Sequence, residues 1–532
     1  MSVAEVLIII GFTILGLIVL GVLGVGAYLF FLDRRQKQHP ILRNYPVLGR
    51  VRYLFEKIGP EFRQYFFDND REGKPLSRKE FEHIVRKSKY KRDVLGFGSQ
   101  RDFEEAGYYI RNSMFPKLTD ELKMDRKTKV TTNRYLLLKD PLFTQREEHL
   151  EEDESFAYLL DEEDTIIIGE HLKQPFHVKG LIGMSAMSYG SLGERAITAL
   201  SKGLGMAKGT WMNTGEGGLS NYHLEGNVDI IMQIGPAMFG VRDLEGNFNW
   251  EELKRKSELP QIKAFELKLA QGAKARGGHI DGEKVTEKIA RIRLVEPYKS
   301  IDSPNRFKDF PDLPSLFNFI NEIRNASGKP VGMKIVIGSD DEADELAEAM
   351  KENKGPDFIT VDGAEGGTGA TYQELADSVG LPIRSALPIL DSALRKHGVR
   401  QQVKIIASGK LFSPDRIAIA LGMGADLVNI ARGFMITVGC IQTMRCHSNS
   451  CPVGVATTDP DLQKALVVEE KKHRTANYVI SMRKALYRIA AAAGVTSPVH
   501  LNEKHIVYKD EKGKTWSLKD IYQPIEEKGD FG

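Results

Sequence analysis

The chain has 532 residues, of which 42% are hydrophobic and 27% are charged, so it is long enough to bury a large core. Its 74 basic and 72 acidic residues leave a formal charge of only +2, so we expect no nucleic-acid partner. Only three cysteines are present, and this odd number excludes a disulfide framework and favours a reducing compartment.

The first predicted element is a membrane anchor at residues 1–32. The run Val6–Leu32 carries no charge and exceeds the roughly 20 residues that a helix needs to cross the hydrocarbon core. A cleaved signal peptide is the alternative, but no basic segment precedes the run and no small-residue cleavage site follows it. Because Arg34, Arg35 and Lys37 follow the run, we expect a single-pass protein of the cell membrane with its body in the cytoplasm.

Residues 33–164 form a charged leader that we expect to be mostly helical or irregular. Its basic stretch, Arg86–Arg92, is interpreted as a solvated surface or as a contact with anionic lipid head groups. The leader closes in two acidic clusters, Glu147–Glu154 and Asp161–Asp164, which we expect to be solvated.

From residue 165 to about 500, short apolar runs alternate with amphipathic stretches, which is typical of repeated βα units around a parallel sheet. Eight strands are predicted, at Leu181–Ser188, Met206–Met212, Ile230–Met238, Phe265–Ala270, Val331–Ile337, Phe358–Asp362, Val403–Ala407 and Leu427–Ala431. Helices are expected at Pro314–Arg324, Glu342–Asn353 and Pro414–Leu421, with Asp341 and Ser413 as capping residues of the last two.

Eight alternating units predict an α/β fold of the TIM (β/α)8 barrel type, in which functional residues lie at the carboxyl ends of the strands. An open doubly wound sheet is the alternative, but no G-x-G-x-x-G follows the first strand. Residues 501–532 remain as a C-terminal tail.

Polar and glycine-rich loops follow the first strands. The loops Met187–Ser191 and Asn213–Gly218 follow strands one and two, and the glycines of the second permit close backbone approach. Lys268, Gln271 and Lys274 follow strand four. Two cations and an amide suit an anionic substrate or a flavin that gains negative charge on reduction, whereas a pair of surface lysines is the alternative.

The later strands carry the pattern of an anion site. Lys334 lies inside apolar strand five, so its ammonium needs a polar partner such as an anion at the barrel mouth. Asp362–Gly369, after strand six, holds four glycines. Ser408–Lys410 and Ala431–Gly433 follow strands seven and eight, where this barrel commonly binds phosphate. These features predict a phosphate-bearing cofactor.

Cys440, Cys446 and Cys451 lie within segment 440–451 with the spacing C-x5-C-x4-C-P. Three thiolates suit a three-iron cluster, since a four-iron cluster usually takes a fourth cysteine. A zinc site that adds His447 is the alternative, but zinc ligands generally come in C-x2-4-C pairs. A catalytic thiol would need only one cysteine and would leave the other two unexplained.

Taken in order, the motifs M-S-Y-G-S, N-T-G-E-G-G, K-L-A-Q-G-A-K, G-G-T-G-A and C-x5-C-x4-C-P-V-G-V-A-T closely resemble the FMN-binding synthase domain of glutamate synthase. The resemblance covers residues 165–500. It implies a barrel with FMN and a 3Fe-4S cluster that reduces the imine formed from 2-oxoglutarate and ammonia to glutamate. Electrons would come from an unidentified donor such as a ferredoxin or a reductase subunit.

The resemblance also implies roles for individual residues. Those at the flavin and its phosphate would be Met187, Ser188, Asn213, Gln233, Lys334, Gly366, Gly367, Ser408, Gly409, Ala431 and Arg432. The catalytic set at the 2-oxoglutarate end would be Glu216, Lys268, Gln271, Lys274 and Arg293. The three cysteines would hold the cluster.

The sequence departs from the family pattern in three ways. We find neither the family's glutaminase domain with its nucleophilic cysteine nor its large C-terminal β-helix, so nitrogen would come from free ammonia, a separate amidotransferase or an amine. Ser303–Asp309 stands where the family has S-P-P-P-H-H-D. The alternative functions are therefore an FMN and iron–sulfur oxidoreductase acting on a different 2-oxo acid or amine, or a membrane-linked electron-transfer module.

Overall fold

The fold is taken from a computed structural model, which describes residues 2–94, 96–99, 101–136, 150–274, 277–352, 354–369 and 371–521. Asn353 of one predicted helix, residues 147–149 of the first acidic cluster and residues 522–532 of the tail lie outside the described residues. The chain divides into two compact units, Met1–Glu82 and His83–Gly532.

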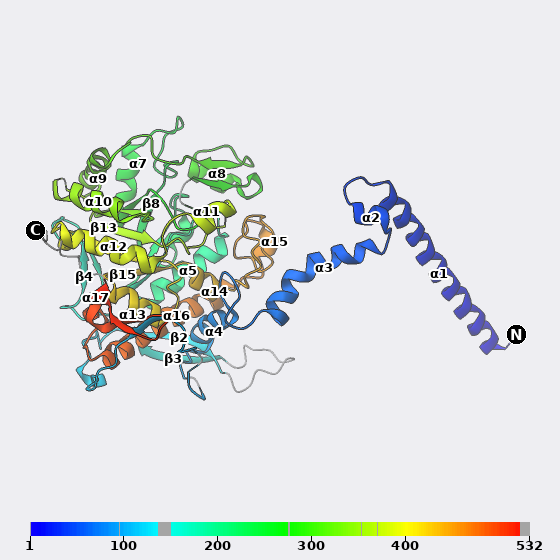
Figure 1. Cartoon of the computed structure of the whole chain (residues 1–532). Coiled ribbons are helices and arrows are strands. Elements are labelled where there is room, and N and C mark those ends of the chain that lie inside the picture. The colour runs from blue at the N-terminus through cyan, green and yellow to red at the C-terminus, as the bar shows by residue number, and fades with distance from the viewer. Residues whose placement is uncertain are drawn as a thin grey trace, which may run out of the picture. The chain divides into compact units, whose positions relative to one another are not determined.

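The first unit is helical. It contains α1 (Val3–Arg35), α2 (Pro40–Asn44), α3 (Gly49–Phe62) and the π-helix η1 (Arg63–Phe67). α1 starts behind a capping box, in which the Ser2 hydroxyl accepts from Glu5 N and the Glu5 carboxylate accepts from Ser2 N. Its most apolar 18 residues have a mean hydropathy of 3.1, so by length and composition this helix can cross a membrane (Figure 1). The predicted apolar N-terminal helix is confirmed.

The second unit is built around a closed barrel of eight parallel strands, in the order β6-β7-β8-β9-β12-β13-β14-β15. The strands are β6 (Ile182–Met184), β7 (Trp211–Asn213), β8 (Asp229–Ile234), β9 (Ile262–Lys268), β12 (Val331–Ile335), β13 (Phe358–Asp362), β14 (Lys404–Ser408) and β15 (Leu427–Ile430). All eight predicted strands are present, so the TIM barrel is confirmed. Strands one and two are shorter than predicted, because residues 185–188 already belong to a loop and residues 206–207 belong to a helix.

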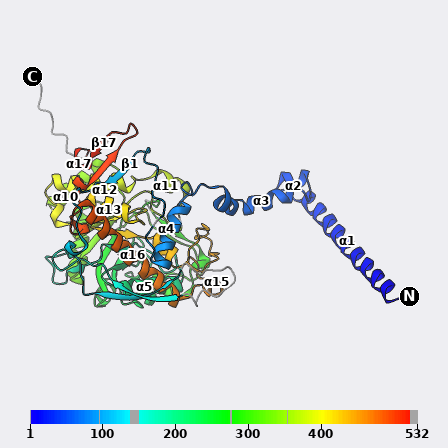
Figure 2. The same cartoon turned by 90° about the horizontal axis from the view of Figure 1, so that it is seen from below.

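Helices follow the strands and lie around this barrel (Figures 1 and 2). They are α5 (Glu194–Ala207), α6 (Asn221–Leu224), α7 (Trp250–Ser257), α8 (Glu287–Arg293), α9 (Leu313–Ser327), α10 (Asp340–Glu352), α11 (Gln373–Ser378), α12 (Ile383–Lys396), α13 (Pro414–Gly422), α14 (Arg432–Thr437), α15 (Pro460–Gln463) and α16 (Val468–Ala493). The longest of these helices, α16, packs against α5.

The three helices named from the sequence are present, with one error at a cap. α13 begins behind Ser413, as predicted. The assignment of Asp341 as a cap is wrong, because α10 already begins at Asp340. The Ser339 hydroxyl accepts from Glu342 N at 3.3 Å instead, so the serine satisfies a free N–H group of the first turn.

The leader is helical only in its first part. After α4 (Arg78–Tyr90) it forms the strands β1 (Gly107–Ile110), β2 (Lys129–Tyr135) and β3 (Leu150–Phe156). β2 pairs with β3, and β1 pairs with β16 (Ile506–Lys509) of the C-terminal tail. The remaining elements are β4 (Ile166–Ile168), β5 (Phe176–Val178), β10 (Gly278–Ile280), β11 (Ile301–Ser303), β17 (Thr515–Ser517) and α17 (Leu518–Ile521).

The basic stretch Arg86–Arg92 is not a solvated or lipid-facing surface at two of its lysines. Lys87 is 4% exposed and its Nζ lies 2.7 Å from Asp93 Oδ1. Lys91 is shielded as well and donates to Asp153 on β3 and, at 2.9 Å, to the Ser155 hydroxyl. The interpretation fails at these positions because acidic partners lie within the same unit.

Candidate active site

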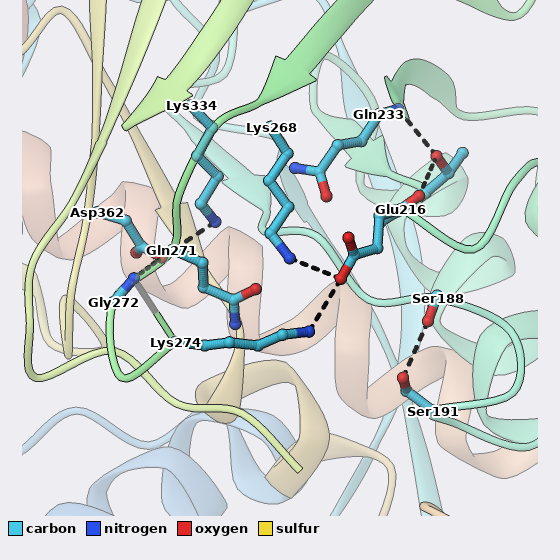
Figure 3. A network of polar contacts seen from close by, with 12 residues as sticks. Ser188, Ser191, Glu216, Gln233, Lys268, Gln271, Gly272, Lys274, Lys334 and Asp362 are labelled. Carbon is cyan, nitrogen blue, oxygen red and sulfur yellow. Dashed lines mark hydrogen bonds and ion pairs between the residues drawn. The ribbon is translucent and has the colours of Figure 1, made fainter. Parts of the chain in front are cut away.

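Glu216, in the loop after β7, is held between two lysines (Figure 3). Its Oε1 accepts from Lys268 Nζ at 2.7 Å and from Lys274 Nζ at 2.9 Å. Lys268 is the last residue of β9, and Lys274 ends the turn that follows. Burial alone would raise the pKa of Glu216, but the two ammonium groups outweigh it and lower this pKa to about 2. Glu216 is therefore a carboxylate at neutral pH.

Lys268 changes its charge near neutral pH. Burial lowers its pKa to about 8, although the Glu216 carboxylate opposes this shift. The nearby charges of Lys274 and Lys334 lower the pKa further, because three ammonium groups repel one another. A buried amine with a pKa near the ambient pH is suited to proton transfer.

A second ion pair lies beside the first. Lys334 on β12 places Nζ 3.2 Å from Oδ2 of Asp362, at the end of β13. The same Oδ2 accepts from Gly272 N at 2.9 Å and so fixes the turn between Lys268 and Lys274. Burial raises the pKa of Asp362, yet Lys334 and the hydrogen bonds lower it overall. The polar partner required by Lys334 is therefore a carboxylate of the chain itself.

Glu266 is a functional candidate that the sequence pattern did not single out. It is fully buried on β9, and its Oε1 accepts from Asn213 Nδ2 at 2.8 Å and from Gln233 Nε2 at 2.6 Å. Its other oxygen accepts from the Thr360 hydroxyl. Glu266 thus fixes which face each amide presents, since it accepts only from their NH2 groups. The sequence signal available for Glu266 was a charged residue inside an apolar barrel strand, which is also the signal that marked Lys334.

Arg293 reaches the site from α8 rather than from a strand. It is 2% exposed, and its Nη2 donates to the backbone oxygen of Tyr189 at 3.0 Å. Its Nε has no hydrogen-bond partner within the described structure. Burial lowers its pKa to about 10, while the charge of Glu216 opposes this shift. A buried, charged donor that lacks a partner suits a polar ligand.

The loop after β6 carries two more of the predicted residues. The hydroxyl oxygens of Ser188 and Ser191 lie 2.9 Å apart, and Nε2 of His223 lies 3.3 Å from the backbone oxygen of Met187. Burial lowers the pKa of His223 to about 4, so this ring is neutral. The loop is therefore fixed from inside the protein.

The loops predicted to hold a phosphate lie against one another. Gln271 Nε2 donates to the backbone oxygen of Gly367 at 3.1 Å, and Arg432 Nη2 donates to that of Glu365. A Cβ atom at Gly367 would lie 3.0 Å from Arg432 Nε, and one at Gly409 would lie 3.3 Å from Glu365 Cδ. Gly409 also has a φ of 141°, which a side chain rarely permits. Gly366 adjoins Gly367, Ser408 ends β14 and Ala431 precedes α14.

The three cysteines lie close enough to influence one another. Burial raises the pKa of Cys440 to about 11, and the negative charges of Cys446 and Cys451 add to this increase. Among the described residues, no three His, Cys, Asp or Glu side chains lie close enough to hold a single metal ion, and this includes the three cysteines with or without His447. A cluster that takes one thiolate for each iron does not need its sulfurs to meet at one point, so three neighbouring thiols fit it.

Lys284 joins the cysteine segment to the loop after β6. It is 4% exposed, and its Nζ donates to the backbone oxygens of Ser191 at 3.1 Å, Cys446 at 2.9 Å and Ala456 at 3.2 Å. A Cβ atom at Gly369 would lie 3.3 Å from Cys446 Cβ, so the segment also lies against the glycine loop after β13. No sequence signal marked Lys284, because its neighbours are those of a surface turn.

The charges of the site suit an anionic ligand. The cations are Lys268, Lys274, Lys334 and Arg293, and the carboxylates are Glu216, Glu266 and Asp362. With Lys268 protonated, one positive charge is in excess. A negatively charged cofactor or substrate would compensate it.

Comparisons with known proteins identify relatives of the whole chain. The profile described as a conserved region in glutamate synthase matches residues 117–496. The chain is 59% identical over 497 residues to the glutamate synthase large subunit-like protein YerD of Bacillus subtilis (strain 168), with 93% of this chain and 94% of that protein covered. The match therefore includes most of the leader as well as the barrel.

More distant relatives align over a smaller part of the chain. The archaeal-type glutamate synthase (NADPH) of Thermotoga maritima is 32% identical over 66% of each protein. The archaeal glutamate synthase (NADPH) of Methanocaldococcus jannaschii is 34% identical over 59% of each. A solved flavocytochrome b2 variant covers 90% of this chain at 13% identity, but its TM-score of 0.42 is too low for any conclusion about the site.

Proposed function

Because the chain belongs to the glutamate synthase family, we propose that it is an FMN- and iron–sulfur-dependent oxidoreductase that forms glutamate from 2-oxoglutarate and ammonia. The observation that carries this proposal is the buried carboxylate of Glu216 between Lys268 and Lys274, with Arg293 within electrostatic range. The excess of cations suits a dianionic substrate with two carboxylates.

The reaction needs one condensation and one reduction. Ammonia adds to the carbonyl carbon of 2-oxoglutarate and water leaves, which gives 2-iminoglutarate. A hydride added to that carbon and a proton added to the nitrogen then give glutamate. FMN, when bound, would supply the hydride.

The chain's own residues would bind the substrate and supply the proton that the imine nitrogen takes up. Lys274 and Arg293 would pair with the substrate's carboxylates. Lys268, with its pKa of about 8, is largely protonated at neutral pH and would donate the proton to the imine nitrogen. Glu216 stays ionised and keeps the lysines in place.

The flavin would be held by the residues at the strand ends. Asn213 and Gln233 would contact the ring in orientations fixed by Glu266. The charge of Lys334, shared with Asp362, would favour the reduced ring. Gly366, Gly367, Gly409 and Arg432 would surround the phosphate.

The cysteines would hold a three-iron, four-sulfur cluster, which supplies one-electron transfer. The contacts of Lys284 and of Gly369 support its position next to the loops assigned to the flavin. The electron donor would be a ferredoxin or a reductase subunit.

The membrane assignment rests on α1. Its length and hydropathy suit a single span, and the basic residues after it would keep the barrel in the cytoplasm. A signal sequence is the alternative assignment for such a helix.

The proposal is tested with purified protein supplied with FMN, iron and sulfide under anaerobic conditions. With a chemical reductant, 2-oxoglutarate and ammonium, we expect glutamate to form, and we expect none when either substrate is omitted. Protein with complete flavin and cluster spectra that forms no glutamate would contradict the proposed substrate.

A different 2-oxo acid or amine is the second candidate substrate. The altered stretch Ser303–Asp309 begins at the end of β11, which pairs with β10. β10 begins at Gly278, which lies against the side chain of Lys274. A Cβ atom at Gly277 would lie 2.9 Å from Asn305 Oδ1, so the altered residues are close to the substrate end. A screen of 2-oxo acids for reoxidation of the reduced flavin distinguishes the two candidates.

A further inference from the structure

The helix α3, in the first unit, carries an apolar face that no other described element of this unit covers. In α3, large apolar residues recur three or four positions apart, which places them on one stripe of the helix. The stripe consists of Val51, Leu54, Phe55, Ile58 and Phe62. Leu54 is 55% exposed and Phe55 is 62% exposed, and no element among the described residues 2–82 covers them.

Exposed aromatic residues also follow directly after α3. In η1, Tyr65 is 55% exposed, Phe66 is 74% exposed and Phe67 is 78% exposed. A protein surface in water rarely leaves so many large apolar side chains uncovered together. Tyr is enriched where a bilayer meets water, since its ring is apolar and its hydroxyl is polar, and Phe is typical of the apolar face of helices that lie in this plane.

The charges around the stripe complement anionic lipid. Eight basic residues and only two acidic residues lie between Arg34 and Arg63. On α3 the basic side chains of Arg52 and Lys57 lie off the apolar stripe. Apolar residues on one face and basic residues on the other are typical of helices that lie in the plane of a membrane surface.

The hydrogen bonds of Asp33 hold the start of α3 next to the end of the apolar run Val6–Leu32. It is the first charged residue after Val6–Leu32 and is 1% exposed. Its carboxylate accepts from Val47 N at 2.9 Å and from Arg50 Nε and Nη2 at 3.0 Å and 2.6 Å. Because Arg50 lies in the first turn of α3, this helix begins where α1 would leave the hydrocarbon core.

We propose that α3 and η1 lie in the membrane interface, with the apolar stripe in the outer acyl region and the basic residues on anionic head groups. The proposal rests on the proposed span by α1, which brings the start of α3 to the interface. It assigns a lipid surface, rather than a protein, as the partner of this face.

The test uses the full-length protein in vesicles of phosphatidylcholine and phosphatidylglycerol in equal parts, prepared with and without brominated acyl chains. Phe55→Trp adds a fluorophore to the stripe, and Lys57→Trp is the matched control on the opposite face. The native protein gives the background of Trp211, Trp250 and Trp516. We expect brominated lipid to quench about half of the emission added by Phe55→Trp and about a tenth or less of that added by Lys57→Trp.

Flotation of the same samples in alkaline carbonate separates this proposal from the span itself. Protein that does not float with the vesicles would refute the span. Protein that floats while the emission added by Phe55→Trp is not quenched would overturn the interface proposal, and a blue-shifted emission would then indicate a protein partner or a second copy. Weaker quenching in vesicles of phosphatidylcholine alone would support the role of the basic residues.

Discussion

The lysines at the mouth of the barrel and the lysine that joins the cysteine segment to the barrel differ in the partners of their ammonium groups. At the mouth, three lysines pair with carboxylates, as in the two lysines on Glu216 and the pair Lys334–Asp362. Lys284 instead donates to three backbone oxygens, one in the cysteine segment, one shortly after it and one in the loop after β6. The contacts at the mouth therefore set the charge of the site, whereas those of Lys284 hold the cysteine segment in place.

This difference predicts that substitutions at the mouth change the reaction and that substitutions at the segment change stability. The largest effect is expected at Lys268. Lys268→Met should lower kcat for glutamate formation by about 100-fold or more, because it removes both a proton donor and a positive charge. Lys268→Arg is the control, since it keeps the charge but does not release a proton at neutral pH. Equal kcat values for the Lys268→Met variant and the native enzyme would contradict the assigned role.

Lys284 tests the opposite side of the comparison. Lys284→Met should lower the free energy of unfolding by about 2 kcal/mol, because one buried and two partly buried backbone oxygens lose their donor. Iron content should fall as well, since the segment loses its connection to the loop after β6. Denaturant titration and iron analysis measure the two effects. Unchanged stability together with full iron content would show that Lys284 does not hold the segment.

A substitution of Glu266 tests whether this carboxylate fixes the orientation of the Asn213 and Gln233 amides. Glu266→Gln keeps the shape but removes the negative charge that strengthens the hydrogen bonds from Asn213 and Gln233. We expect FMN to bind about tenfold more weakly, which corresponds to the loss of one good hydrogen bond. Fluorescence titration with FMN measures this change, and Glu266→Asp should restore part of the affinity.

The smallest predicted effect is a pH dependence at the mouth. Lys268 is charged below its pKa of about 8 and loses its charge as the pH rises through that value. Between pH 7 and pH 8, kcat/KM for 2-oxoglutarate should therefore fall about twofold. In Lys268→Arg this decline should disappear. A decline that persists in the arginine variant would have to be assigned to another group.

The comparison also explains which parts of the molecule were predictable from the sequence. The eight barrel strands were found because βα alternation is a local pattern. Strand β1 was missed because its partner β16 lies nearly 400 residues away, and the burial of Lys91 was missed because Asp153 is supplied by a distant strand.

The residues of the candidate site follow the same rule. Lys268, Lys274 and Lys334 were visible as charges in or after apolar strands. Their partners were not, since the contacts between Glu216 and the lysines or between Asp362 and Lys334 arise only when the barrel closes. Glu266 and Lys284 act entirely through such distant contacts, so their roles required the structure.

Our central proposal is that the mouth of the barrel is a site for 2-oxoglutarate beside a flavin. The most direct measurement is the anaerobic reoxidation of the chemically reduced, FMN-loaded protein, followed by flavin absorbance. We expect reoxidation when 2-oxoglutarate and ammonium are both added, with one glutamate formed for each flavin reoxidised. A flavin that stays reduced with this pair but is reoxidised by another 2-oxo acid and ammonium would contradict the claim.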